Sequence, residues 1–220
     1  MSISESEFIG NKVDPASDLG YGGAILIDKE SGRNGYDGTF VPYEDVNILI
    51  DLSNFSDNLG YAGGAITFQS CAGVVQRCRF IRNQVTQNGA DIGQLFFPGE
   101  EIAVTDIGIP TEILSSYFEI DGSTNQGGSI YLDSMGQYSY EYVDTEDFDE
   151  NGCATISFEE SNNKKLVGGS AKIDGCTFVG LPSQNSVRGG AIYVRNDKFF
   201  ELTSSRFYNT TATSGGAVYA

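Results

Sequence analysis

The sequence predicts an all-β protein, a right-handed parallel β-helix (β-solenoid), on the basis of three observations. A Gly-Gly-Ala/Ser-apolar tetrapeptide recurs along the 220-residue chain, and the residues after each copy alternate between apolar and other side chains. No long window shows the 3.6-residue apolar period of a helix. Recurrence at a period of about 20 to 50 residues is typical of stacked repeats, each of which packs on its neighbours.

The tetrapeptide has six clear copies and a degenerate one, which begins at Asn88. The six begin at Gly22, Gly63, Gly127, Gly168, Gly189 and Gly215. The shorter gaps are 21 to 26 residues, and the gaps of 39 to 41 residues indicate one rung plus an insertion, or two short rungs. We expect one domain, residues 1–220, of about eight or nine rungs of roughly 20 to 26 residues, with insertions near 31–48, 93–113 and 133–152. A β-propeller is the weaker alternative, because its blades need about 40 residues.

Each Gly-Gly pair suits a tight corner, because glycine tolerates a positive φ, and a strand follows it. One face of these strands is apolar in every copy, so we expect it to point inward: Ile25/Ile27, Ile66/Phe68, Ile130/Leu132, Ala171/Ile173, Ile192/Val194 and Val218/Ala220. We expect the other face to point outward: Ala24/Leu26, Ala65/Thr67, Ser129/Tyr131, Ser170/Lys172, Ala191/Tyr193 and Ala217/Tyr219.

A second motif, an aromatic residue followed closely by Asn, precedes the glycines. Its copies are Phe8 with Asn11, Phe55 with Asn58, Phe80 with Asn83, and the shortened Phe207 with Asn209. Three of the four Phe residues lie 8 residues before the next glycine corner. This motif predicts another strand with its Phe inward, ending in a turn at Asn, which accepts the left-handed conformation.

The combination of Gly-Gly-Ala-Ile with Phe-x-x-Asn resembles the repeat pair of the polymorphic outer membrane proteins. These are autotransporter adhesins first described in chlamydiae, and similar repeats occur in surface proteins of some protists. The resemblance runs from Phe8 to Val218 and is clear in four of about eight units. It implies an extracellular β-helical passenger that serves in adhesion or surface structure.

The amino-acid composition narrows the classes of binding partner and the cellular setting that we expect. The chain has 30 acidic and 13 basic residues, a net charge of −17, which disfavours nucleic acids and anionic membranes as partners. No apolar run reaches the roughly 18 residues of a membrane span, and residues 1–7 lack the features of a signal peptide. Because the last repeat stops inside an expected strand, we expect a piece of a longer solenoid.

The cysteines and two sequons add weaker signals. Cys78 and Cys176 stand two residues before a Phe and are expected to be buried thiols, with a disulfide such as Cys71–Cys78 as the alternative; Cys153 completes the four cysteines. The sequons at Asn54 and Asn209 would carry glycans in a eukaryotic secretory pathway.

An acidic stretch within the third expected insertion resembles the start of a calcium loop. Asp147, Asp149 and Asn151 alternate along the chain and Gly152 follows, as in Asp-x-Asp-x-Asn-Gly. Oxygen ligands at alternate positions before a glycine turn suit Ca²⁺. The twelfth position of the loop is Phe158 instead of a carboxylate, so a solvated acidic loop is the alternative. We expect no other cofactor.

Tyr131, Tyr193 and Tyr219 share a position on the face expected to be outward, with Lys172 in the same column. An exposed aromatic strip of this kind would stack on sugar rings or anchor a protein. Tyrosines also simply cover β-surfaces well, and this is the structural alternative.

Catalysis has little support, because the chain has no His and therefore no Ser-His-Asp, Cys-His or His-metal site. Polysaccharide lyases and hydrolases with β-helix folds use carboxylates and basic residues on adjacent rungs; Asp51, Asp91, Arg79 and Arg82 are conceivable here. We expect a non-enzymatic extracellular or cell-surface module, adhesive or structural, able to form filaments. Its expected partners are itself, other surface proteins or glycans, with no membrane insertion in this segment. A polysaccharide-binding or polysaccharide-cleaving β-helix is the alternative.

Overall fold

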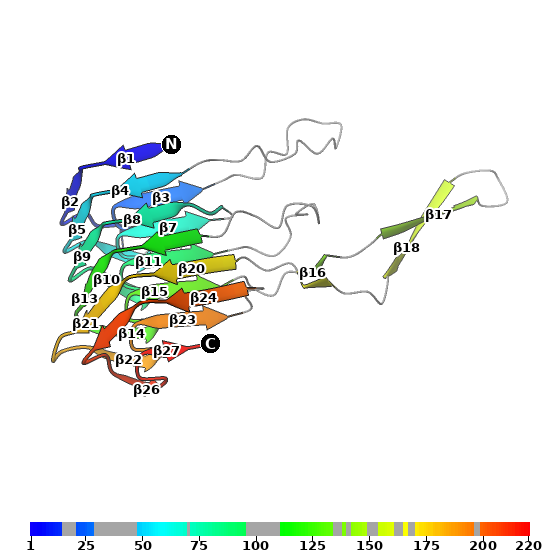
Figure 1. Cartoon of the computed structure of the whole chain (residues 1–220). Helices are drawn as coiled ribbons and strands as arrows, with labels where there is room; N and C mark the ends of the chain where they lie inside the picture. The colour runs from blue at the N-terminus through cyan, green and yellow to red at the C-terminus, as the bar shows by residue number, and fades with distance from the viewer. Residues whose placement is uncertain are drawn as a thin grey trace.

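The described part of the chain folds into β-strands alone (Figure 1). The computed structural model describes residues 1–14, 21–28, 48–69, 71–95, 111–133, 138–139, 142–148, 154–160, 165–166, 170–195 and 199–220. None of these residues is helical, so the expectation of an all-β protein is confirmed for them. The main body consists of four parallel sheets, which we call A to D.

Each sheet takes one strand from each successive repeat of the chain, except that the described part of the first repeat has no strand in sheet C. Sheet A contains β1 (Ser2–Ser4), β4 (Leu49–Asp51), β8 (Val74–Gln76), β12 (Thr111–Leu114), β20 (Ser170–Asp174) and β24 (Phe199–Thr203). Sheet B contains β2 (Glu7–Ile9), β5 (Asn54–Ser56), β9 (Arg79–Ile81), β13 (Tyr117–Ile120), β21 (Thr177–Gly180) and β25 (Arg206–Tyr208). Sheet C contains β6 (Leu59–Ala62), β10 (Gln84–Asn88), β14 (Ser123–Gln126), β22 (Asn185–Arg188) and β26 (Ala212–Ser214). Sheet D contains β3 (Ile25–Asp28), β7 (Ile66–Gln69), β11 (Ile92–Leu95), β15 (Ile130–Asp133), β23 (Ile192–Arg195) and β27 (Val218–Tyr219).

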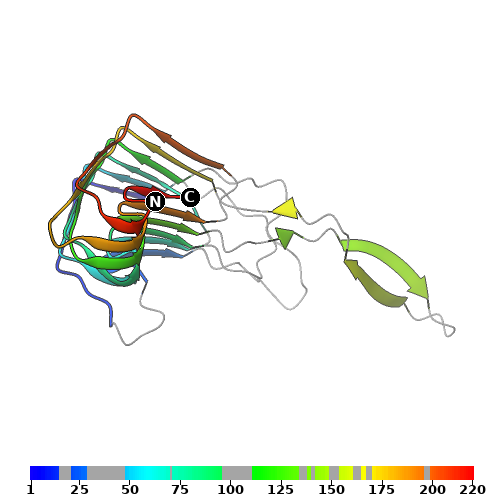
Figure 2. The same ribbon diagram turned by 90° about the horizontal axis from the view of Figure 1, so that it is seen from below.

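The chain visits the sheets in the order A, B, C, D and then starts the next repeat in sheet A. Figure 2 shows these sheets from below, with strands of successive repeats stacked on one another. The described residues form six such repeats, so the expectation of eight or nine rungs is wrong. The count falls because the gaps from Gly22 to Gly63 and from Asn88 to Gly127 each hold one repeat plus an insertion. In addition, the Gly168 copy precedes β20, a sheet A strand and not a further sheet D strand.

Left-handed residues turn the chain at the corners. At the corner between sheets C and D, each repeat has a glycine with φ between 62° and 68°, including Gly89 of the degenerate copy. A Cβ atom at Gly127 would lie 2.1 Å from the carbonyl oxygen of Ile130. Both this clash and the positive φ exclude a side chain at Gly127. The corner between sheets A and B uses mostly other residue types, among them Leu52 and Arg77, at φ near 50°.

The core lies between the sheets and is built from columns of identical positions. Six Phe side chains of sheet B stack face to face at 4.7 to 5.0 Å between centroids: Phe8, Phe55, Phe80, Phe118, Phe178 and Phe207. The expected inward face of sheet D is confirmed by the burial of Ile66, Phe68, Ile130 and Leu132. Parallel, in-register pairing therefore converts each sequence motif into a ladder of like side chains.

The expected outward columns are largely buried, which corrects the sequence-based interpretation. Ala65, Ser129 and Ala191 are fully buried because they lie at the corner before each sheet D strand. Tyr131 and Tyr193 are only 5% and 2% exposed. They pack in a second apolar cluster with Ala62, at the end of β6 in sheet C, together with Tyr21, Tyr61 and Tyr219. Alternation along one strand does not reveal that the neighbouring sheet covers the second face.

We predict that Phe118→Ala lowers the free energy of unfolding by about 3–5 kcal/mol, because it leaves a cavity in the middle of the Phe ladder. Denaturant unfolding monitored by circular dichroism measures this. Phe207→Ala is the matched control, since Phe207 has one stacked neighbour and is half-buried. Equal losses for the two variants would show that ladder position does not matter.

Candidate functional site

The edge where sheet D meets sheet A carries all three long connections of the chain (Figure 1, right-hand side of the sheets). Residues 29–47 join β3 to β4, residues 96–110 join β11 to β12, and residues 134–169 join β15 to β20. The strands continue to Leu95 and resume at Thr111, so the expected insertion at 93–113 begins later and ends earlier. The expected insertions near 31–48 and 133–152 lie mostly outside the described residues, and the strands that flank them end and begin at this edge.

The third connection contains strands of its own. β17 (Tyr142–Phe148) pairs antiparallel with β18 (Ala154–Glu160), and β16 (Tyr138–Ser139) pairs with β19 (Lys165–Leu166). The backbone of Asp147 lies in β17, opposite Thr155. Asp149 and Asn151, the other two expected calcium ligands, lie outside the described residues, as does Cys153. Among the described residues no cluster of three acidic or cysteine side chains is placed to hold a metal ion.

An ion pair between a buried carboxylate and an exposed arginine lies on the outer face of sheet D beside this edge. The carboxylate of Asp133 is fully buried and accepts a hydrogen bond of 3.0 Å from Arg195 Nε in the next repeat. Tyr131 Oη donates to Asp133 Oδ2 at 2.6 Å. Burial, reinforced by this hydrogen bond to an acidic neighbour, raises the pKa of Tyr131. The arrangement ties β15 to β23 just before the third connection leaves the sheet.

The tyrosines expected to bind a partner form a stacked column next to this ion pair. The rings of Tyr131 and Tyr193 lie 5.5 Å apart, and those of Tyr193 and Tyr219 lie 5.4 Å apart, nearly parallel in both cases. The Arg188 guanidinium lies 5.4 Å from the centroid of Tyr219. Because the first two rings are buried, the expectation of an exposed aromatic strip is wrong for Tyr131 and Tyr193; only Tyr219 is half-exposed.

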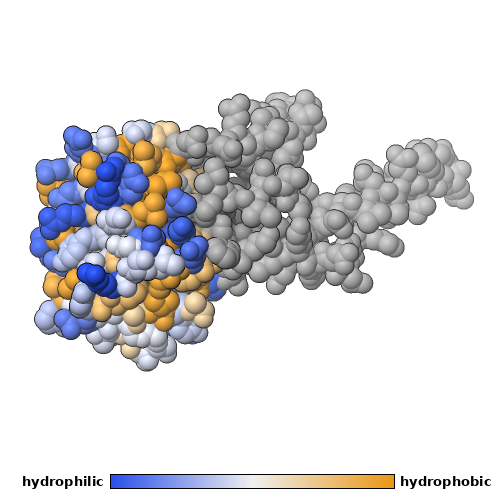
Figure 3. Space-filling model, in the orientation of Figure 1, coloured by the Kyte–Doolittle hydropathy of each residue, from blue (hydrophilic) through white to orange (hydrophobic). Residues whose placement is uncertain are grey.

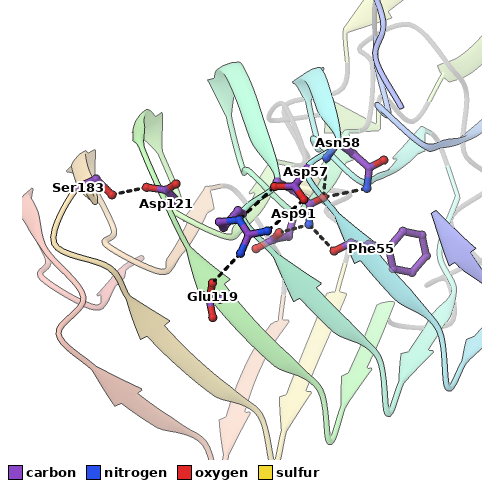
Figure 4. Close-up of polar contacts among 9 residues, drawn as sticks. Phe55, Asp57, Asn58, Asp91, Glu119, Asp121 and Ser183 are labelled. Carbon is purple, nitrogen blue, oxygen red and sulfur yellow. Dashed lines mark hydrogen bonds and ion pairs between the residues drawn. The ribbon is translucent and has the colours of Figure 1, made fainter. Parts of the chain in front are cut away.

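Three Asn residues of the Phe-x-x-Asn motif, Asn11, Asn58 and Asn83, form a hydrogen-bonded ladder whose last two members are buried. Figure 4 shows the part of the ladder around Asn58. Asn58 Oδ1 accepts from the backbone N–H and the side chain of Asn11, both at 2.9 Å. Asn58 Nδ2 donates in turn to Asn83 Oδ1 at 2.9 Å and to the carbonyl oxygen of Phe8. The ladder thus satisfies the polar groups at the corner between sheets B and C.

The ladder ends at Asp91, which belongs to the corner between sheets C and D. Asn83 Nδ2 donates to Asp91 Oδ1 at 2.8 Å and to the carbonyl oxygen of Phe55. Gln184 serves a similar purpose in the fifth repeat, where its Nε2 donates to the carbonyl oxygens of Gly190 and Thr211, and its Oε1 accepts from the Thr211 N–H. Burial raises the pKa of Asp91 to about 7, since the polar side chains of Asn83 and Ser129 offset it only in part.

A row of charged side chains lies on the outside of the corner between sheets B and C (Figure 4). Arg82 forms hydrogen bonds of 3.1 Å with both carboxylate oxygens of Asp57 and approaches Glu119 at 3.7 Å. Asp121 accepts a hydrogen bond from Ser183 in the following repeat. These exposed pairs link successive repeats but each contributes little to stability in water.

The residues considered for polysaccharide chemistry do not meet in one place. Asp51 is paired with Arg77, whose hydrogen bond lowers the pKa of Asp51. Arg79 lies 5.7 Å from the ring centroid of Tyr117 on the outer face of sheet B. Asp91 is buried and Arg82 is engaged with Asp57. The described residues thus supply no pair of exposed carboxylates aligned with a basic residue from this set.

Cysteines and sequons have distinct surroundings. Cys78 and Cys176 are buried free thiols, so the Cys71–Cys78 disulfide does not form. Burial raises the pKa of both thiols to about 11, which keeps them protonated and unreactive at neutral pH. Of the two sequon asparagines, Asn209 is exposed at a corner with φ of 53°, whereas Asn54 is half-buried in β5.

The surface shown in Figure 3 mixes polar and apolar residues over its described part, with several apolar ones near the edge between sheets D and A. In the described part of the chain no helix has the length and apolar character needed to cross a membrane. Comparison of the chain with models of protein families, with curated proteins and with solved structures finds no match in any of the three.

Sequence reasoning missed three features of these columns. The Asn residues were interpreted as turn formers, although their fixed place after each Phe was a signal for a ladder. In the degenerate copy at Asn88, Asp91 is the only acidic residue in a column otherwise filled by Ala and Ser. This exception was a signal that Asp91 has a special environment. The Asp133–Arg195 pair gave no signal, because 62 residues separate its members in the sequence.

We predict that Asn58→Ala lowers the free energy of unfolding by at least about 2 kcal/mol, because it removes the buried hydrogen bonds that the Asn58 side chain makes with Asn83, with the Phe8 carbonyl oxygen and with Asn11. Chemical unfolding of the purified chain measures the loss. Asn11→Ala provides the control, because Asn11 is exposed at the end of the ladder and water can replace its partner. A loss at Asn58 no larger than that at Asn11 would contradict a structural role for the ladder.

Proposed function

We propose that the chain is a right-handed parallel β-helix that serves as a rigid scaffold in an adhesive or structural module at a cell surface. The observation that carries this proposal is the placement of all three long connections at one edge. Parallel sheets with one strand from each repeat support the β-helix, and a six-repeat stack supports the rigidity. Long loops on a rigid frame are a common arrangement for recognition surfaces.

Charge supports adhesion through the third connection. Its sequence is rich in carboxylates: Glu141, Asp144, Glu146, Asp147, Asp149, Glu150, Glu159 and Glu160. We propose that this connection contacts a partner of opposite charge, either another copy's basic residues, a surface protein or a glycan with bridging cations, Ca²⁺ included. Such contacts weaken as salt concentration rises, because exposed charges are screened over about 10 Å at 0.1 M.

The extracellular setting rests on the resemblance of the repeats to surface adhesins and on the exposed sequon at Asn209. A polysaccharide-cleaving activity is the alternative function, and a cleavage assay separates it from binding. Tyr219 stays a candidate contact residue because it is half-exposed at the end of the tyrosine column.

The proposal can be tested by replacing a long connection between sheets D and A with a short one that already occurs in the chain. Residues 196–198 join β23 to β24 in the fifth and sixth repeats. We predict that replacing residues 134–169 with Asn-Asp-Lys, the sequence of 196–198, leaves the melting temperature within a few degrees of the unmodified chain. Circular dichroism and thermal unfolding check that the fold persists.

The functional readout is adhesion. Beads coated with the unmodified chain should cluster with one another or bind to immobilised neutral and acidic polysaccharides, and the shortened variant should lose most of this adhesion. A matched variant with residues 96–110 replaced in the same way tells whether the acidic connection is specifically required. Absence of adhesion by the unmodified chain in both formats refutes the proposal, and release of oligosaccharides favours the cleaving alternative.

A further inference from the structure

Asp91 is a buried acid with an incomplete set of hydrogen bonds. It is 1% exposed, and only its Oδ1 has a partner, the Asn83 side chain. Its Oδ2 and the hydroxyl of the adjacent Ser129 are both buried and complete no hydrogen bond. The described side chain that forms a hydrogen bond with Asp91 is thus a neutral amide, and no cation balances a charge on this carboxyl group.

A proton fits this place, whereas a counter-ion does not. Successive repeats stack directly on Asp91: its backbone N–H donates to the Ser129 carbonyl oxygen at 2.9 Å, and its own carbonyl oxygen accepts from Ala65 and Ile66. The corner is tightly packed, since a Cβ atom at Gly64 would lie 2.3 Å from the Ala90 carbonyl oxygen. A protonated carboxyl group supplies a hydrogen without adding volume.

Charged neighbours do not compensate an ionised Asp91. The elements packed against this corner carry Asp57, Arg82, Glu119 and Asp121, which lie in the outer row and pair with one another or with Ser183. None of them takes part in a hydrogen bond or ion pair with Asp91, and the described side chains that act on its carboxyl group, Asn83 and Ser129, are both neutral. An ionised carboxylate would therefore be buried without a cation.

We propose that the Asp91 carboxyl group holds a proton and that release of this proton loosens the corner between β10 and β11. The corner is then a pH-sensitive joint in the middle of the stack. This inference is independent of the proposed adhesive function.

The direction of the pH effect follows from the folded and unfolded states. In the folded chain the pKa of Asp91 is raised to about 7, whereas an unfolded Asp titrates near 3.8. Between these values only the folded state keeps the proton, so stability is lost as the pH rises and levels off above about 7. The chain has no His, which removes the side chain that ordinarily titrates in this range.

The test compares unfolding of the unmodified chain and Asp91→Asn in denaturant between pH 5 and pH 8.5. Asn mimics the protonated acid, since it has nearly the same size, carries no charge and can accept from Asn83. We expect the unfolding equilibrium constant of the unmodified chain to rise about tenfold per pH unit from pH 5 to pH 7, and that of the variant to stay constant. The variant should be the more stable of the two at pH 8.

Asp91→Ala adds a second comparison, because Ala occupies the same position in the repeats of Ala65 and Ala191. It too should lose the pH dependence. Amide hydrogen exchange gives a local readout: at pH 8 the Asp91 and Ile92 amides should exchange faster than the equivalent Ala191 and Ile192 amides, and this difference should vanish in Asp91→Asn. The same pH dependence in the unmodified chain and in Asp91→Asn, or an Asp91→Asn variant less stable at pH 8, would overturn the proposal.

Discussion

The in-register parallel pairing of successive repeats is the constraint on which the rest of the structure depends. Because Phe55 pairs with Phe80, and Phe80 with Phe118, one inward position becomes a continuous stack of rings. The same register places Asn58 on Asn83, so that one buried amide satisfies the next. Whether a side chain packs well at any position therefore depends on the side chains one repeat before and after it.

The corners make this register achievable, because every repeat must turn in the same place to bring its strands over those of the last. A glycine with positive φ occupies the corner between sheets C and D in all six repeats. The corner between sheets B and C is less uniform. There the Asn ladder ends at Asn83, which donates to Asp91 of the next corner, and in a later repeat Gln184 bonds the carbonyl oxygens of Gly190 and Thr211 instead.

The return from sheet D to sheet A is free of these constraints, and it is where the chain varies in length. Its connections range from residues 196–198 to residues 134–169, while the flanking strands keep their register. Loop length affects stability only weakly when the ends of the loop are held by the scaffold. The scaffold therefore tolerates connections of very different length at this edge, and the proposed adhesive role depends on that tolerance.

The sequence by itself determined the strand content, the parallel stacking, the glycine corners and the inward face that carries Ile66 and Ile130, because each of these repeats at a fixed spacing and depends on local conformation or hydrophobicity. It did not determine the number of repeats, since an insertion and an extra rung lengthen a gap equally. Only the tertiary structure placed the three insertions at one edge and buried Tyr131 and Tyr193, because both outcomes depend on how sheet D lies against its neighbours. The Asp91 joint combines the two: the sequence contained the exceptional acid, and burial between Asn83 and Ser129 decided its chemistry.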